Sequence, residues 1–118
     1  MKLLSMYFSM VLVAWGYSVP AYSDVCSRTP QVVAELMVES GKANCMDIET
    51  EDLAKIESLD LSNKSITALQ AGDFDGLANL ISLSLFSNQL TSLPDGLLVG
   101  LNTLSGLDLG ANQLSSLP

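Results

Sequence analysis

Apolar residues recur at fixed places in residues 56–118, in a unit of 24 residues. Residues 56–79 match residues 80–103, and residues 104–118 begin an incomplete third copy. The aligned apolar positions are Leu59, Leu83 and Leu107; Leu61, Leu85 and Leu109; Ile66, Leu90 and Leu114; Leu69, Leu93 and Leu117; Phe74 and Leu98; and Leu77 and Leu101. A fixed period of this length predicts a solenoid of stacked units.

Within each unit, leucines alternate with polar residues over a few positions, which predicts a short strand with one buried face. One unit cannot bury its own leucines, so neighbouring units must stack with their strands parallel. Asn88 and Asn112 follow the predicted strands of the second and third units. A carboxamide can donate to and accept from backbone groups that a turn leaves unpaired, so we expect both to be structural turn residues.

The pattern LxxLxLxxNxL stands in this chain at residues 80–90 and 104–114. It resembles the leucine-rich repeat family, and the LxxLP segment later in the unit is similar to repeats common in extracellular proteins. The resemblance implies an α/β solenoid, a right-handed superhelix with a short parallel β-sheet on its concave face. The first unit departs from the family pattern because Lys64 replaces the asparagine, so we expect its turn to be built differently.

The N-terminus has the pattern of a signal peptide over residues 1–23. Lys2 precedes an apolar run that ends at Trp15, Pro20 follows, and the small-residue pattern of residues 21–23 predicts cleavage after Ser23. The alternative is an uncleaved anchor, because about 20 residues can span a bilayer. The serines in the run and Pro20 favour cleavage. We therefore expect a secreted or extracytoplasmic protein, at the cell surface or in a periplasm, with no membrane contact after cleavage.

The remaining chain is strongly acidic. Removing Lys2 with the signal segment leaves four basic residues against thirteen acidic ones, a net charge of −9. Binding to nucleic acid depends on clustered Lys and Arg, so nucleic acid is excluded as a partner. We interpret the acidity as a source of solubility rather than as a binding patch.

Residues 24–55 are predicted to form a helical cap over the first repeat. Thr29 and Pro30 predict a helix start, with the threonine hydroxyl as cap, and a second short helix is expected from Thr50. Cys26 and Cys45 are the only cysteines, and in an exported chain they most simply form one disulfide. This segment resembles the N-terminal cap of bacterial secreted leucine-rich repeat proteins.

The sequence holds no arrangement of catalytic residues. It has no histidine, which excludes a Ser-His-Asp or Cys-His arrangement. Asp73 and Asp75 could contact calcium, but the spacing of a calcium loop is missing, so we interpret them as residues of a solvated turn. We expect no enzyme activity, no metal and no cofactor.

Function must then come from a surface. The outward positions of the three predicted strands are Ser58, Asp60, Ser62, Ser82, Ser84, Phe86, Gly106, Asp108 and Gly110. The family resemblance implies that such positions bind a protein or a glycan, and these nine are the candidate contacts. Most are Ser or Gly, whereas hot spots favour large side chains, so Phe86 is the candidate anchor. The alternative is a structural capping fragment of a longer repeat protein, with no ligand of its own.

The third unit has nothing after it in this sequence to cover its leucines. Water-exposed apolar surface forgoes about 25 cal/mol per Å², so an uncovered unit is costly. We predict that this end either self-associates or frays beyond about Leu101.

Overall fold

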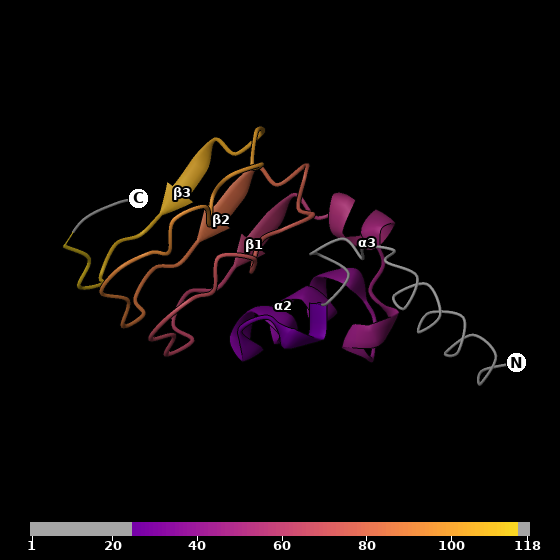
Figure 1. The fold of residues 1–118 in the computed structure, drawn as a ribbon, viewed down its shortest axis with the longest axis horizontal. Helices are drawn as coiled ribbons and strands as arrows, with labels where there is room; N and C mark the ends of the chain where they lie inside the picture. Colours follow the sequence, from indigo (N-terminus) through magenta and orange to yellow (C-terminus); the bar gives the residue numbers. More distant parts are fainter. Residues whose placement is uncertain (1–24, 116–118) are drawn as a thin grey trace, which may run out of the picture.

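The computed structural model describes residues 25–115, and the predicted signal peptide lies outside that range. Two helices, α2 (Pro30–Ser40) and α3 (Thr50–Ala54), and two short 3-10 helices, η2 (Val25–Ser27) and η3 (Cys45–Asp47), come first. The strands β1 (Ser58–Asp60), β2 (Ser82–Ser84) and β3 (Gly106–Asp108) follow. Figure 1 shows the helical part at one end of the sheet and β3 at the other end.

Helix α2 begins and ends with residues suited to those positions. Pro30 occupies its first turn, and Gly41 ends it in a left-handed conformation with φ 73°. Val32 and Leu36 are completely buried on the face toward the repeats. The expected threonine cap is wrong, because the Thr29 side chain makes no capping hydrogen bond to α2. Its hydroxyl is instead used in a contact with the first repeat, described below.

Helix α3 starts at Thr50, as predicted, and is anchored by the residues around it. The Glu49 backbone N–H donates to Oδ2 of Asp52 at 2.8 Å. This hydrogen bond, with smaller help from Lys42, holds the pKa of Asp52 below its usual value. Leu53 points inward and is completely buried, so even this short helix adds to the core.

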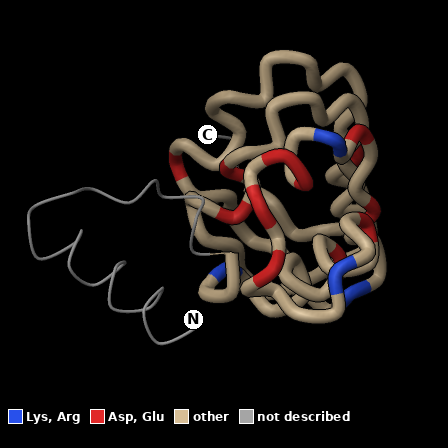
Figure 2. Tube along the Cα trace, turned by 90° about the vertical axis from the view of Figure 1, so that its right-hand side faces the viewer, with Lys and Arg blue, Asp and Glu red and all other residues tan. Residues whose placement is uncertain are grey.

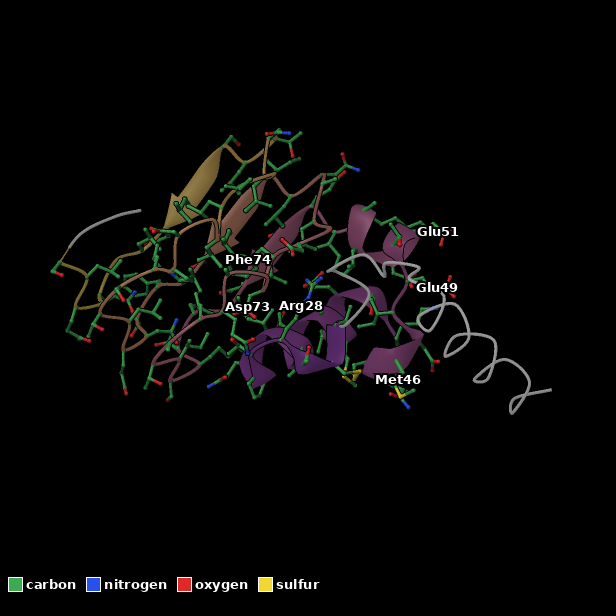
Figure 3. All side chains as sticks on the ribbon, viewed as in Figure 1. Arg28, Met46, Glu49, Glu51, Asp73 and Phe74 are labelled. Carbon is green, nitrogen blue, oxygen red and sulfur yellow. A yellow bond between two sulfur atoms is a disulfide. The ribbon has the colours of Figure 1, made fainter. Side chains whose placement is uncertain are left out.

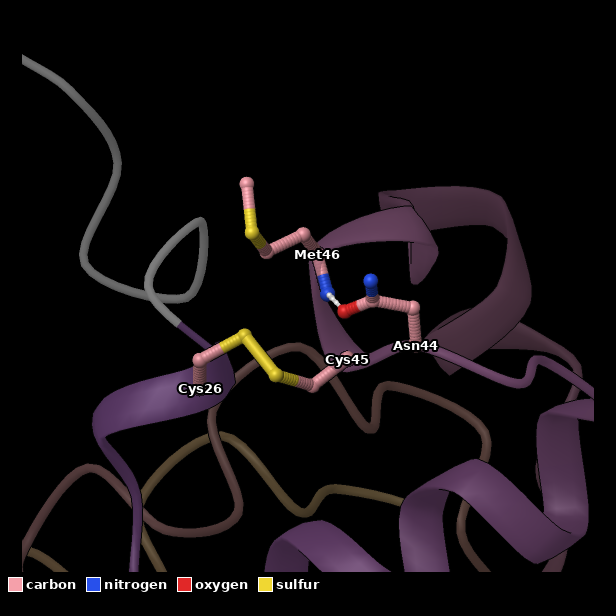
Figure 4. Close-up of a disulfide and its surroundings, with 4 residues drawn as sticks. All are labelled: Cys26, Asn44, Cys45 and Met46. Atoms are coloured by element: carbon pink, nitrogen blue, oxygen red, sulfur yellow. Dashed lines mark hydrogen bonds between the residues drawn. A yellow bond between two sulfur atoms is a disulfide. The ribbon is translucent and has the colours of Figure 1, made fainter.

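A disulfide joins the two 3-10 helices of the cap, as the cysteine count predicted. Cys26 lies in η2 and Cys45 in η3, with their Cα atoms 5.3 Å apart (Figure 4). Beside it, Oδ1 of Asn44 accepts a hydrogen bond from the Met46 backbone N–H at 3.1 Å. The cap is therefore closed covalently at the point where the described chain begins.

The sheet has three parallel strands in the order β1-β2-β3. Each residue pairs with the residue 24 positions later, so that Leu59, Leu83 and Leu107 lie side by side. The repeat period therefore equals the register of the sheet. The strands are only three residues long, so Ser62, Phe86 and Gly110 lie just beyond them and not within them.

The core is continuous from the cap through the repeats. It includes Val32 and Leu36 of α2, the leucines beneath the strands, and apolar residues from the opposite side of each unit such as Phe74 and Leu77. On that side, residues 71–76 and 95–100 form turns, and within the described residues helices are confined to the cap. None of the helices within residues 25–115 is long and apolar enough to cross a membrane.

Burial falls sharply in the third unit. Leu59 and Leu83 are each 1% exposed, whereas Leu107, at the same place in the sheet, is 41% exposed. Leu104, Leu109 and Leu114 are only partly buried, and Leu117 lies outside the described residues. The leucines of this unit are covered by β2 on one side only, because no described element lies on the other.

Reducing the Cys26–Cys45 disulfide should lower the melting temperature by roughly 10 °C or more, because closing a loop of this size contributes about 3 kcal/mol. Thermal unfolding followed by circular dichroism, with and without reductant, measures this change. A Cys26→Ser, Cys45→Ser double variant serves as the control, since reductant should leave its melting temperature unchanged. An equal melting temperature for the oxidised and reduced wild type would contradict a stabilising role.

Candidate functional site

The nine predicted contact positions lie together on one side of the sheet, which we call the strand face. Six of them are exposed and three are half-buried. The exposed ones are Ser58, Asp60, Ser82, Phe86, Asp108 and Gly110, and the half-buried ones are Ser62, Ser84 and Gly106. The structure thus gathers these residues on an accessible surface, and their role as ligand contacts stays a prediction.

Phe86 is the one large side chain on the strand face, and Gly110 of the next repeat makes room for it. A Cβ atom at Gly110 would lie 3.1 Å from Cδ1 of Phe86 and 3.2 Å from Oδ1 of Asp108. The ring edge and the carboxylate therefore border the same small space above the glycine. With 42% of its surface exposed, Phe86 keeps much of its ring available.

Asp60, Ser84 and Asp108 occupy the same position in the three units, and each side chain supports the turn that follows its strand. Oδ1 of Asp60 accepts hydrogen bonds from the Ser62 hydroxyl at 2.6 Å and the Ser62 N–H at 2.9 Å. These bonds, the hydroxyl first, hold the pKa of Asp60 below its usual value. Oδ1 of Asp108 accepts from the Gly110 N–H, and the Ser84 hydroxyl accepts from the Phe86 N–H. Within the described residues, Oδ2 of either aspartate accepts no hydrogen bond.

Asn88 ties two consecutive repeats together beneath the strand face. Its Oδ1 accepts from the backbone N–H groups of Lys64 and Ile66, each at 3.0 Å. Its Nδ2 donates to the carbonyl oxygens of Leu61 and Leu85, each at 2.9 Å. The side chain is 5% exposed, so these backbone groups would otherwise be buried without partners.

Asn112 repeats the arrangement one unit later. Its Oδ1 accepts from the Leu90 N–H at 3.1 Å, and its Nδ2 donates to the carbonyl oxygens of Leu85 and Leu109. Each asparagine therefore bonds its own turn and the turn before it. These side chains set the spacing of the stack and do not face the strand surface.

Lys64 replaces the asparagine in the first unit, where the neighbour is the cap instead of another repeat. Its Nζ lies 3.8 Å from Oε1 of Glu35 on α2, and its carbonyl accepts a hydrogen bond from the Gln31 side chain. Ser65, the next residue, has a left-handed backbone with φ 56°, whereas the matching residues of the later units do not. The different turn expected from the sequence is therefore present, and it contacts the cap helix.

Sequence reasoning missed the buried contact that joins the cap to the first repeat. Asp73, interpreted above as part of a solvated turn, has no exposed surface. Its Oδ1 accepts from the Thr29 N–H at 2.9 Å, and its Oδ2 accepts from the Thr29 hydroxyl at 2.6 Å and the Gln70 N–H at 2.7 Å. Its carbonyl accepts from Arg28 at 3.0 Å (Figure 3). We call this the cap latch: Arg28, Thr29, Gln70 and Asp73.

One signal in the sequence could have revealed the cap latch. At the spacing of 24, Asp73 aligns with Leu97, which is 1% exposed in the core of the second repeat. An acidic residue at a core position of an otherwise regular repeat indicates a buried partner, because a buried carboxylate must be paired or hydrogen-bonded. The alignment thus holds the information, although only the structure identifies Thr29 as the partner.

Acidic residues also collect at the cap end of the molecule. Figure 2 views this end and shows more acidic than basic positions across it. Glu39, Asp47, Glu49, Glu51 and Glu57 are exposed in this part of the chain. Lys42 lies near one further acid, with its Nζ 3.6 Å from Oδ2 of Asp52.

Comparison with known proteins assigns the chain to a protein family. The model of the family described as "Leucine rich repeat" matches residues 51–118. With the repeat register and the asparagine contacts described above, this match shows that the chain belongs to the leucine-rich repeat family. A comparison with curated protein sequences gave no match.

Solved structures of two bacterial proteins are similar to this chain. Internalin C2 from Listeria monocytogenes is 26% identical with a TM-score of 0.60, over 75% of this chain and 43% of that protein. A second internalin of the same bacterium, InlF, is 25% identical with a TM-score of 0.63, over 74% of this chain and 25% of that protein. The chain therefore spans less than half of either protein.

Replacing Asp73 by alanine should destabilise the protein by about 3 kcal/mol, because the buried N–H and hydroxyl of Thr29 would lose their acceptor. Chemical denaturation measures the change. Asp95→Ala is the matched control, since it removes the same charge from an exposed turn of the second repeat and should shift stability by less than about 0.5 kcal/mol. Equal effects of the two substitutions would mean that the cap latch does not stabilise the fold.

Proposed function

We propose that this protein is an extracytoplasmic, non-enzymatic recognition module that binds a protein ligand through its strand face. The observation that carries the proposal is Phe86, an exposed aromatic ring placed beside Gly110 and Asp108 on a surface otherwise made of short side chains. Aromatic residues are frequent among the residues that contribute most binding energy at interfaces. The small neighbours of Phe86 leave its ring accessible to a ligand on the strand face. The proposed division is a cap over residues 24–55 and repeats over residues 56–118.

The charge of the strand face favours a ligand segment that carries Lys or Arg. Asp60 and Asp108 are exposed, each has an oxygen without a hydrogen bond from the described residues, and none of the nine positions is basic. A cation beside a carboxylate and over an aromatic ring is attracted by both groups. The net charge of −8 for the whole sequence would also attract a basic ligand from a distance.

The extracytoplasmic location is supported by the Cys26–Cys45 disulfide, since such bonds persist mainly in oxidising compartments. The predicted signal peptide agrees with it but lies outside the described residues. A glycan ligand stays a prediction, with the same ring and carboxylates as its contacts.

The alternative function is that of a capping fragment without a ligand. One observation favours it: six of the nine strand-face positions are Ser or Gly, two are Asp and one is Phe, so the contact area is small. The two functions differ in whether the strand face binds anything specifically.

Panning a phage-displayed random peptide library against the protein tests the proposal. We expect enriched peptides to contain Lys or Arg beside an apolar residue, and Phe86→Ala to weaken their binding at least about tenfold, as loss of an aromatic anchor does. Met46→Ala removes a large side chain that is 80% exposed on the cap and should leave binding unchanged.

Peptides that bind the Phe86→Ala variant as well as the wild type would contradict the strand-face site. Enrichment of acidic peptides would contradict the basic ligand. If panning enriches no peptide and a glycan array shows binding that depends on Phe86, the ligand is a glycan. Failure of both screens would support the capping fragment.

A further inference from the structure

The turn after β1 carries its asparagine one residue earlier than the turns of the later units. Asn63, Lys64 and Ser65 form the sequence Asn-x-Ser, whereas residues 87–89 and 111–113 read Ser-Asn-Gln and Ala-Asn-Gln. Asn-x-Ser or Asn-x-Thr, with any middle residue except proline, is the acceptor sequence for N-linked glycosylation in exported proteins. Such a sequence occurs once in the 118 residues. The first repeat therefore has an acceptor sequence where the later repeats have a structural asparagine.

The structure places this acceptor sequence on the surface. Asn63, Lys64 and Ser65 are exposed, whereas Asn88, the structural asparagine of the next unit, is 5% exposed. Within residues 25–115, neither the Asn63 carboxamide nor the Ser65 hydroxyl makes a hydrogen bond. These two side chains define the acceptor sequence, so an enzyme can reach both without breaking a hydrogen bond of the described fold.

The conformation of the turn does not account for these two side chains. Asn63 has a left-handed backbone with φ 57°, which asparagine tolerates well, but Ser87 and Ala111 adopt 60° and 55° at the matching positions. The turn therefore does not require asparagine. Ser65 has φ 56°, which strains a serine backbone, and its hydroxyl gains no hydrogen bond in return. Strain without a structural gain indicates another role for this hydroxyl.

The groups around the Asn63 side chain are held by contacts that do not involve it. The Asn63 backbone N–H donates to the Phe86 carbonyl at 3.0 Å. Nζ of Lys64 lies 3.8 Å from Oε1 of Glu35, and the Lys64 carbonyl accepts from the Gln31 side chain. The turn is thus fixed against β2 and α2 by its neighbours, while the Asn63 carboxamide projects from it without a partner.

We propose that Asn63 is the attachment site of an N-linked sugar. In the transfer step, Nδ2 of Asn63 forms a bond to C1 of a sugar activated as a glycosyl diphosphate. The C1–O bond breaks, its electron pair leaves with the diphosphate, and Nδ2 loses one proton. The attached sugar adds a bulky, hydrated group at the junction of the first repeat and the cap. This inference rests on the extracytoplasmic location proposed above and is independent of the ligand of the strand face.

Mass spectrometry of the protein exported by the cells that produce it tests the proposal, because it measures processing and modification in one sample. We expect a chain that begins at Asp24 or a near neighbour and exceeds the mass of its sequence by a whole number of sugar residues. Peptide-N-glycosidase should remove this excess and leave an aspartate at position 63, because the enzyme hydrolyses the bond between Cγ and the sugar-bearing Nδ2.

Two variants remove the acceptor sequence and suit the backbone of the turn. Asn63→Ser introduces the residue that Ser87 supplies in the second repeat, and Ser65→Gly removes the hydroxyl at a left-handed position that glycine adopts without strain. Each should be exported with the mass of the bare chain. Asn102→Gln is the matched control and should keep the sugar, since Asn102 is exposed but belongs to no acceptor sequence.

Exported wild type with the mass of the bare chain would overturn the inference and leave the proposed location intact. A sugar that persists on both Asn63→Ser and Ser65→Gly would also overturn it, because the attachment site would then lie elsewhere. A chain that keeps Met1, stays inside the cell and carries no sugar would contradict the location and the inference together.

Discussion

The stack of repeats depends on a buried carboxylate that fixes the cap to it. A leucine-rich unit leaves its apolar face open unless a neighbour covers it, and the first unit has only the cap as its neighbour. Apolar contact from α2 gives most of the burial but does not fix the orientation of the cap on the first repeat. The cap latch fixes this orientation, because Asp73 accepts hydrogen bonds from both the backbone and the hydroxyl of Thr29, and its backbone carbonyl accepts one from Arg28. Because Thr29 and Asp73 are buried, any other position of the cap would cost the Asp73 carboxylate its two hydrogen bonds from Thr29.

The hydrogen bonds that hold each unit to its neighbour differ along the stack. Between repeats, Asn88 and Asn112 bond the backbone of two turns at once, so identical units follow one another at a fixed spacing. At the cap there is no preceding turn to bond, and Lys64 instead contacts Glu35 of α2. Departures from the repeat pattern at Lys64 and Asp73 thus occur where the chain changes from repeats to cap.

Much of the fold could be predicted from the sequence because the period of 24 sets both burial and register. The leucine positions predicted where the strands lie and the parallel pairing of Leu59 with Leu83, and two cysteines allowed only one disulfide. The cap latch could not be predicted in the same way, since it joins Thr29 to a residue 44 positions away. On the strand face, the alternation placed Phe86 correctly outward, but the space that it shares with Gly110 and Asp108 depends on side-chain positions in the adjacent repeat.

A double-mutant cycle between Thr29 and Asp73 tests the central claim most directly. Thr29→Ala, Asp73→Ala and the double variant would be unfolded with denaturant beside the wild type. If the two side chains act as one contact between cap and repeat, their effects are not additive, and the coupling energy should be about 1 to 3 kcal/mol. Additive effects within about 0.5 kcal/mol would contradict the account, since the cap would then be held by apolar packing alone.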